Sequence, residues 1–232
     1  MKISISIIAS ILIVFITISA AQEKEKSILI DPGHSPNSIG AISCSGKPEY
    51  IYNDLLAKSV TEFLKSKQIS VDLTRREQEN INIIDRTSRS SHYKLLLSLH
   101  HDSVQTRFLD RKSRNHGQCS EKAKGFSIFI SRKNQYYEKS IRYAEALGTA
   151  LVNRGLTPTL HHAEPIIGEN RELLVPDKGI YVYDNLSILK NAQCPALLLE
   201  AAVIVNPRED LLSGTVAFRL IVAESIYDML AK

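Results

Sequence analysis

Residues 95–102 read LLLSLHHD. Apart from Ser98, residues 95–99 are apolar on both faces of an extended chain, which is typical of a central strand in a parallel sheet. The run then ends in His100, His101 and Asp102, and functional side chains in such folds collect at the carboxyl ends of strands. The stretch therefore predicts an α/β core with a site at the end of this strand.

The flanking sequence alternates between strand and helix patterns. Apolar positions recur at helical spacing on one face between Ile51 and Leu64, and again in 135–154. The expected strands are 27–31, 69–74, 95–100, 126–130, 180–182 and 195–201, and the expected helices are 48–64, 81–93, 135–154, 186–191 and 215–230. Residues 157–177 are expected to be irregular. This order predicts a single domain, a mostly parallel twisted sheet of about six strands with helices on both faces.

The composition is that of an ordinary globular protein. The 232 residues are 44% hydrophobic and 23% charged, which is enough for one continuous core. A net charge of +4 is too small to indicate a nucleic-acid partner. We expect a monomer with no nucleic acid bound.

The N-terminus predicts export. Lys2 precedes an uncharged run from Ile3 to Ala21 that ends in small residues, the pattern of a signal peptide over residues 1–21. A short charged linker, 22–26, then leads into the domain, 27–232. An uncleaved membrane anchor is the alternative, but four Ser residues dilute the run and small residues close it, so we expect cleavage and no membrane association afterwards. The expected location is the periplasm, the cell envelope or the medium.

Side chains suited to metal chemistry or catalysis lie at or just after the ends of three predicted strands and at the start of one predicted helix. His34 comes just after the first strand, His100 ends the third, and Glu49 opens the first helix. Two imidazoles and one carboxylate suit Zn²⁺ with an open position for water. Glu200, at the end of the last strand, is the candidate catalytic general base.

The chain also resembles a known family, on motifs spread over residues 28–231. The matching pieces are Ile30-Asp31-Pro32-Gly33-His34, Gly40-Ala41, Glu49 with Asn53, Leu73-Thr74-Arg75, Arg86, Leu97-Ser98-Leu99-His100, Gly125-Phe126, and Pro195-Ala196-Leu197-Leu198-Leu199-Glu200 through Asn206. As a set they resemble the zinc-dependent N-acetylmuramoyl-L-alanine amidases of bacterial cell separation and sporulation.

The resemblance implies an enzyme that hydrolyses the amide bond between N-acetylmuramic acid and L-alanine in peptidoglycan. It implies His34, Glu49 and His100 as zinc ligands and Glu200 as the catalytic carboxylate. The chain departs from the family at His101, at Ala201-Ala202-Val203, in a longer polar stretch over 102–124, and in lacking a long inhibitory helix before residue 135. These departures put substrate preference and regulation in question.

Two other functions remain open. One is a different secreted zinc amide hydrolase, a peptidase or deacetylase that acts on envelope material. The other is a non-catalytic wall-binding module, which the retention of all four key residues disfavours. The chain has no HExxH motif, so a zincin-type protease is disfavoured as well.

Several polar residues near these motifs have more ordinary interpretations. His101 is expected to support the site or the packing rather than to bind metal, because successive strand residues point to opposite faces. Asp31 is expected to fix the turn or to orient a ligand histidine. Asn53 lies one helical turn beyond Glu49 and is expected either to support it or to belong to a polar helix surface. Arg75 and Arg86 are expected to be structural ion-pair partners. The remaining histidines of the irregular segments are expected to be solvated: His116, His161 and His162.

Two of the three cysteines, Cys44 and Cys119, and the polar stretch 102–124 lie in loops expected to border the zinc cleft. A disulfide between Cys44 and Cys119 is plausible in an oxidising compartment, and three free thiols are the alternative. The polar stretch has more basic than acidic side chains. A stretch rooted at this cleft can cover the metal as a lid or extend the substrate groove, and its basic charge favours a groove for the acidic stem peptides. A solvated loop is the alternative.

Overall fold

The structure, a computed structural model, describes residues 27–110 and 119–231. The expected signal peptide, 1–21, and linker, 22–26, lie outside these residues. No helix within the described ranges is long and apolar enough to cross a membrane.

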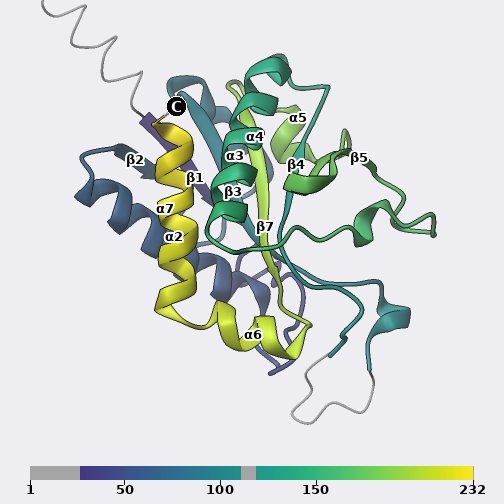
Figure 1. The fold of residues 1–232 in the computed structure, drawn as a ribbon. Helices are drawn as coiled ribbons and strands as arrows, with labels where there is room; N and C mark the ends of the chain where they lie inside the picture. Colours follow the sequence, from purple (N-terminus) through teal and green to yellow (C-terminus); the bar gives the residue numbers. More distant parts are fainter. Residues whose placement is uncertain (1–26, 111–118, 232) are drawn as a thin grey trace, which may run out of the picture.

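The core is one seven-stranded sheet in the order β2-β1-β3-β7-β4-β6-β5 (Figure 1). The first four strands in this order run parallel to their neighbours, β4 pairs antiparallel to β7, and the edge strand β5 pairs antiparallel to β6. The strands are β1 (Ser27–Pro32), β2 (Ser70–Leu73), β3 (Leu95–Asp102), β4 (Ser127–Ile130), β5 (Glu172–Val175), β6 (Ile180–Val182) and β7 (Ala196–Val203).

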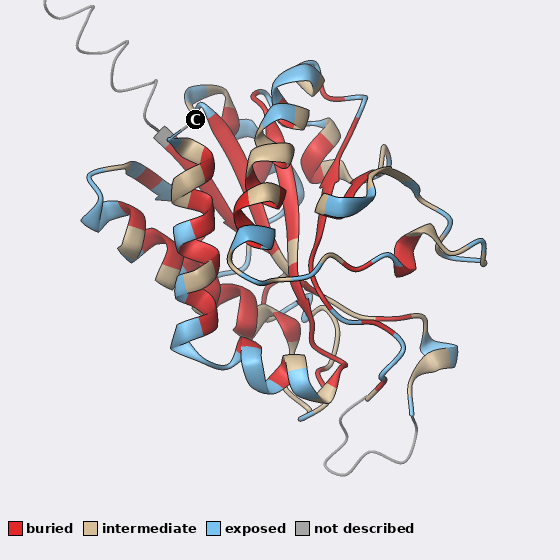
Figure 2. Ribbon diagram, viewed as in Figure 1, coloured by how far each residue is buried: buried red, intermediate tan, exposed pale blue. Residues whose placement is uncertain are grey.

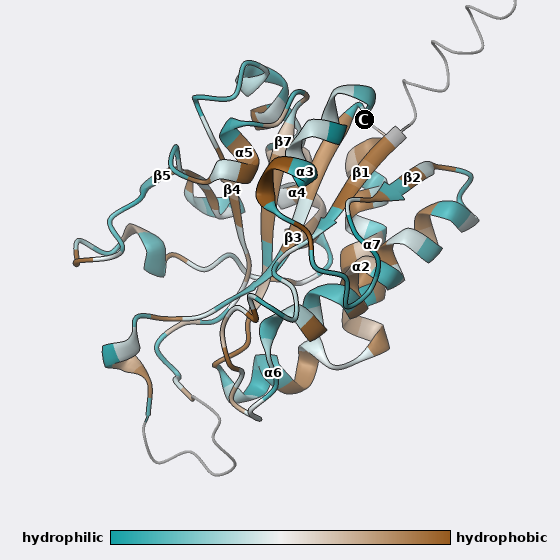
Figure 3. Cartoon of the chain, turned by 180° about the vertical axis from the view of Figure 1, so that it is seen from behind, coloured by the Kyte–Doolittle hydropathy of each residue, from teal (hydrophilic) through white to brown (hydrophobic). Residues whose placement is uncertain are grey.

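Helices cover both faces of this sheet. One layer contains α2 (Glu49–Ser66), α4 (Tyr137–Asn153) and α7 (Val216–Leu230), with α7 packed between the other two. The view from behind shows α3 (Ile83–Ser88) and α5 (Ser187–Lys190) over the opposite face (Figure 3). The α6 helix (Pro207–Ser213) follows the end of β7.

The alternation of side chains along the central strands divides the core into two clusters. Leu95, Leu97 and Leu99 pack in the cluster beneath α2, α4 and α7, whereas Leu96 packs in the cluster on the α3 and α5 side. Both faces of β3 are therefore dry, and Figure 2 shows the central strands buried along most of their length. The parallel strands β1, β3 and β7 are adjacent, so their carboxyl ends meet at one edge of the sheet.

The predicted fold is confirmed, with differences at its margins. The sheet has a seventh strand, β5, inside the segment 157–177 that was expected to be irregular. The predicted helix 81–93 is a short α-helix, α3, followed by the 3₁₀ helix Arg89–His92. The α6 helix was not predicted; Asn206 caps it, accepting hydrogen bonds from the amides of Arg208 and Glu209, and Pro207 occupies its first turn.

Candidate metal centre and active site

Three predicted ligands converge at the edge where β1 and β3 end. Glu49 lies between two imidazoles: its Oε2 is 3.1 Å from His34 Nε2, and its Oε1 is 3.1 Å from His100 Nδ1. One ligand atom from each residue lies within 4.8 Å of the others. Glu49 is buried, while His34 and His100 keep 30% and 15% of their side chains exposed, so the cluster is open to solvent on one side.

Strand register explains how residues far apart in sequence meet here. Pro32 pairs with Leu99, which places His34 beside His100. On the other side of β3, His100 pairs with Glu200 of β7. Paired residues of neighbouring strands point to the same face, so His100 and Glu200 project to one side of the sheet.

Two glycines leave the space that the cluster occupies. A Cβ on Gly33 would overlap the His100 ring, and a Cβ on Gly40 would overlap Glu49 Oε2 and approach the His34 ring. Gly40 also has a φ of 73°, which side-chain-bearing residues rarely adopt. The backbone is thus shaped closely around this donor set.

Neighbouring polar groups fix the Glu49 carboxylate. Its Oε2 accepts a hydrogen bond from the Ala41 amide at 3.0 Å, and its Oε1 accepts from Asn53 Nδ2 at 3.0 Å and from the His101 amide at 3.2 Å. Burial alone would raise the pKa of Glu49, but hydrogen bonds and charge from His100 and His34 hold that pKa well below its usual range. The carboxylate is therefore ionised and oriented.

Asn53 and His101 lie behind the cluster and do not enter it. Asn53 Oδ1 lies 2.8 Å from His101 Nδ1, and the buried His101 ring packs near Tyr52. Burial lowers the pKa of His101 to about 4, so its ring is neutral. These contacts fit the expected supporting role of both residues.

Asp31 and Arg86 hold the turn that carries His34. Asp31 is fully buried and accepts hydrogen bonds from Thr74 Oγ1 at 2.6 Å and Ser98 Oγ at 2.7 Å. Arg86 lies 3.5 Å from Asp31 Oδ1 and donates to the His34 carbonyl at 2.7 Å. This support matters because His34 itself has a φ of 60°.

Arg75 holds the same turn from the other side. Its guanidinium forms a 2.6 Å ion pair with Asp54 and donates to the carbonyls of Pro32 at 3.2 Å and Gly33 at 3.3 Å. The prediction that Arg75 and Arg86 are structural ion-pair partners is confirmed.

Glu200 has the environment of a carboxylate suited to proton transfer. Its Oε2 atom is buried, with no hydrogen-bond partner in the part of the chain that the structure describes. Burial raises the pKa of Glu200 well above its usual range, and the negative charges of Asp102 and Glu49 raise it further. A carboxyl group with a raised pKa can both accept and return a proton near neutral pH.

A disulfide closes the loops near the cluster. Cys44 and Cys119 are bonded, with Cα atoms 4.4 Å apart, and Cys194 is a free, buried thiol. The structure therefore confirms the expected pairing.

Part of the polar stretch 102–124 lies outside the described ranges. This part is residues 111–118, which include Arg111, Lys112, Arg114 and His116.

The expectation that His161 and His162 are solvated is wrong. Both are buried, each only 7% exposed, because the segment that carries them folds back onto the end of β3. His162 Nε2 lies 2.8 Å from Asp102 Oδ2, and its Nδ1 lies 2.9 Å from Glu169 Oε2. No periodic pattern in the sequence predicts the burial of these two residues. Their burial arises from contacts with residues distant in sequence, such as Asp102.

Comparison with known proteins gives one consistent family. The sequence profile of the N-acetylmuramoyl-L-alanine amidases matches residues 28–232. The chain is 26% identical over 207 residues to the probable cell wall amidase LytH of Staphylococcus saprophyticus, covering 88% of this chain and 57% of that protein. It is 27% identical to the amidase AmiC of Neisseria meningitidis (86% and 50% covered) and 26% identical to AmiA of Escherichia coli (87% and 74% covered). This chain thus spans about half the length of the first two relatives.

Solved structures share the fold. The amidase Ami1 of Mycobacterium abscessus matches with a TM-score of 0.69 at 19% identity, over 89% of this chain and 97% of that one. The catalytic domain of CwlV from Bacillus (Paenibacillus) polymyxa matches with a TM-score of 0.67 at 22% identity, over 89% and 96%.

Proposed function

This chain belongs to the N-acetylmuramoyl-L-alanine amidase family, and from that premise we propose that it is a zinc enzyme of the bacterial cell wall. It hydrolyses the amide bond between N-acetylmuramic acid and L-alanine in peptidoglycan. His34, Glu49 and His100 hold the zinc ion, and Glu200 is the catalytic carboxylate.

The observation that carries this proposal is the bridging of two imidazoles by Glu49. Glu49 lies 3.1 Å from His34 and 3.1 Å from His100. The cluster is packed so closely against Gly33 and Gly40 that a side chain at either position would overlap it. Two histidines and one carboxylate with an open side are the donor set of catalytic zinc sites. When bound, zinc would polarise the scissile carbonyl and make a water molecule acidic near neutral pH.

The chain's own residues account for the proton transfers. Glu200 takes a proton from the attacking water as the oxygen adds to the carbonyl carbon. It then gives the proton to the L-alanine nitrogen as the carbon–nitrogen bond breaks, so the products are a lactyl carboxylate and a free peptide amine. Burial raises the pKa of Glu200, and a cation held by His34, Glu49 and His100 would counter this by favouring the ionised form.

The setting proposed for this reaction is the cell envelope. Residues 1–21 act as a signal peptide, and the Cys44–Cys119 disulfide supports an oxidising compartment. The partner is peptidoglycan, and the chain works as a monomer without nucleic acid or membrane contact after signal cleavage.

Digestion of purified peptidoglycan tests this function. We expect mass spectrometry to find intact glycan strands and free stem peptides that begin with L-alanine, with none produced in the presence of a chelator. Cleavage within the stem peptide would instead indicate a peptidase, and loss of acetyl groups a deacetylase. Binding to the wall without any released product would indicate a non-catalytic module.

A further inference from the structure

A second cluster of metal-ligating side chains lies at the end of β3, two residues beyond His100. Asp102 closes the strand, and His161 and His162 form the 3₁₀ turn that packs against it (His161–Ala163). Asp102 Oδ2 lies 3.4 Å from His161 Nε2 and 2.8 Å from His162 Nε2. One ligand atom from each residue lies within 4.8 Å of the others.

The Nδ1 atom of each imidazole ring, the nitrogen that does not face Asp102, already has a hydrogen-bond partner. His161 Nδ1 lies 2.8 Å from Thr159 Oγ1, and His162 Nδ1 lies 2.9 Å from Glu169 Oε2. When Nδ1 donates to such a partner, Nε2 becomes the nitrogen with a free lone pair. This is how metal-binding histidines are commonly oriented.

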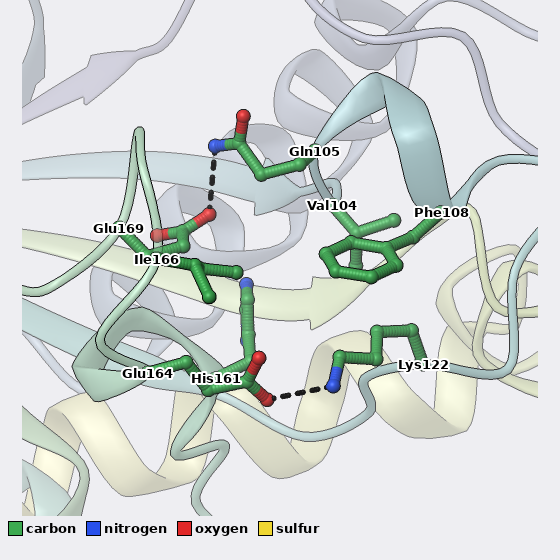
Figure 4. Close-up of a pocket in the computed structure, with 8 residues that line it drawn as sticks. All are labelled: Val104, Gln105, Phe108, Lys122, His161, Glu164, Ile166 and Glu169. Carbon is green, nitrogen blue, oxygen red and sulfur yellow. Dashed lines mark hydrogen bonds and ion pairs between the residues drawn. The ribbon is translucent and has the colours of Figure 1, made fainter.

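Glu169 is itself held in place. Its Oε1 accepts a hydrogen bond from Gln105 at 2.9 Å, and Arg171 forms a 3.0 Å ion pair with its Oε2. Figure 4 shows Gln105 and Glu169 together on one side of a pocket whose wall also contains His161. Glu169, which contacts His162, is therefore oriented by two further side chains.

A simple ion pair accounts for only half of this cluster. Burial works to lower the pKa of His162, but Asp102 and Glu169 outweigh it and raise that pKa to about 9, so a protonated His162 could balance the carboxylates. His161 does not fit that interpretation. Its buried Nε2 lies 3.4 Å from Asp102 Oδ2 without forming a hydrogen bond, and it has no hydrogen-bond partner among the described residues. A buried polar atom without a partner is uncommon and calls for one.

We propose that Asp102, His161 and His162 form a second binding site for a divalent transition-metal ion, with zinc as the first expected occupant. Two imidazoles and a carboxylate are suited to zinc. The ion would give His161 Nε2 its missing partner and would join the segment carrying Glu169 to the end of β3. This site shares no ligand with the His34–Glu49–His100 cluster, and the proposal does not depend on the amidase activity.

Metal content of the purified chain tests the proposal. Protein without a histidine tag is saturated with zinc, exchanged against a weak chelator that removes loosely held ions, and analysed by mass spectrometry of the metal. We expect two zinc ions per chain in the wild type. The double variant His161→Gln, His162→Gln and the first-site variant His100→Ala should each retain one. The control His92→Ala, at an exposed histidine, should retain two.

The outcomes separate the two sites. One zinc ion in the wild type, kept by the double variant and lost from His100→Ala, would overturn the second site and leave the first intact. One ion kept by His100→Ala and lost from the double variant would support the second site and contradict the first. If the double variant does not fold, His100→Ala alone decides: one remaining ion supports the proposal, and none overturns it.

Discussion

Glu49 has both oxygens engaged by fixed partners: the Ala41 amide on one, and Asn53 and the His101 amide on the other. The carboxylate therefore loses little freedom when it binds a cation. The same oxygens face His34 and His100, whose rings meet edge to face with centroids 4.9 Å apart. Metal binding at this cluster should depend on all three side chains together.

Replacing His100 tests that dependence. In His100→Ala the cluster keeps only His34 and Glu49, and two protein ligands seldom hold zinc tightly. We expect zinc at this cluster and nearly all amidase activity to be lost, while the unfolding temperature of the metal-free protein changes little. Full retention of activity in this variant would show that His100 is not a ligand.

The ligands could be predicted from sequence because each follows or begins a recognisable element. The proposed ligand His34 follows a strongly apolar strand and the proposed ligand His100 lies near the end of another, and parallel strands bring their ends together. His161 and His162 follow no such element. His162 contacts Asp102 and Glu169, which lie 60 and 7 residues away from it, and no helical or strand periodicity indicates such contacts.

At the scale of elements, the loop between β1 and α2 shapes the site. Gly40 in this loop has a φ of 73° and lies against Glu49 and His34, and Gly155, after α4, has a φ of 84° with open space around it. These two glycines form a matched pair, because both need the left-handed conformation but only one touches the cluster.

Alanine at each glycine separates strain from site disruption. Gly155→Ala should lower the free energy of unfolding by about 1–2 kcal/mol, with zinc affinity and activity unchanged. Gly40→Ala should suffer the same strain and in addition displace Glu49, so zinc affinity and activity should fall sharply. Zinc titration and thermal unfolding of both variants measure this. Equal zinc affinity in the two would mean that Gly40 does not shape the site.

The disulfide joins the loop after β1 to the loop after β3. Cys44 and Cys119 are separated by 75 residues, and a cross-link of this span restricts the unfolded chain strongly. Reduction should lower the free energy of unfolding by about 4 kcal/mol. Denaturant unfolding with and without reductant measures it. The double variant Cys44→Ser, Cys119→Ser should show no effect of reductant, and a clear effect there would assign the stabilisation elsewhere.

The elements that the sequence did not predict are short. The edge strand β5 has only the four residues ELLV, and it forms because β6 is beside it to pair with. The α6 helix did carry a local signal, since Asn206 followed by Pro207 is a typical helix start. The positions of helix ends and edge strands are decided by packing against other segments. The core helices and strands can be predicted from the periodicity of their own sequence.

At the scale of the whole molecule, the sheet brings four segments to one edge. The strands β1, β3 and β7 are neighbours, and α2 begins at the edge of the sheet where they end. Residues 34, 49, 100 and 200 are therefore brought to the same edge, although 166 positions separate the first from the last. Helices cover both faces of this sheet (Figure 3). Of the proposed metal ligands, His100 thereby lies on β3 directly opposite Glu200, the proposed proton-transfer group, on the neighbouring strand β7.

The rate at which L-alanine amino groups appear in purified peptidoglycan tests this account most directly. Wild type is compared with Glu200→Gln at equal zinc content, and with Glu62→Gln, at an exposed position of α2, as the control. Glutamine has nearly the shape of glutamate but cannot accept the proton, so the rate of Glu200→Gln should be lower than that of wild type by roughly 10²–10⁴-fold. The rate of Glu62→Gln should equal that of wild type. A Glu200→Gln rate within a few-fold of wild type would contradict the account.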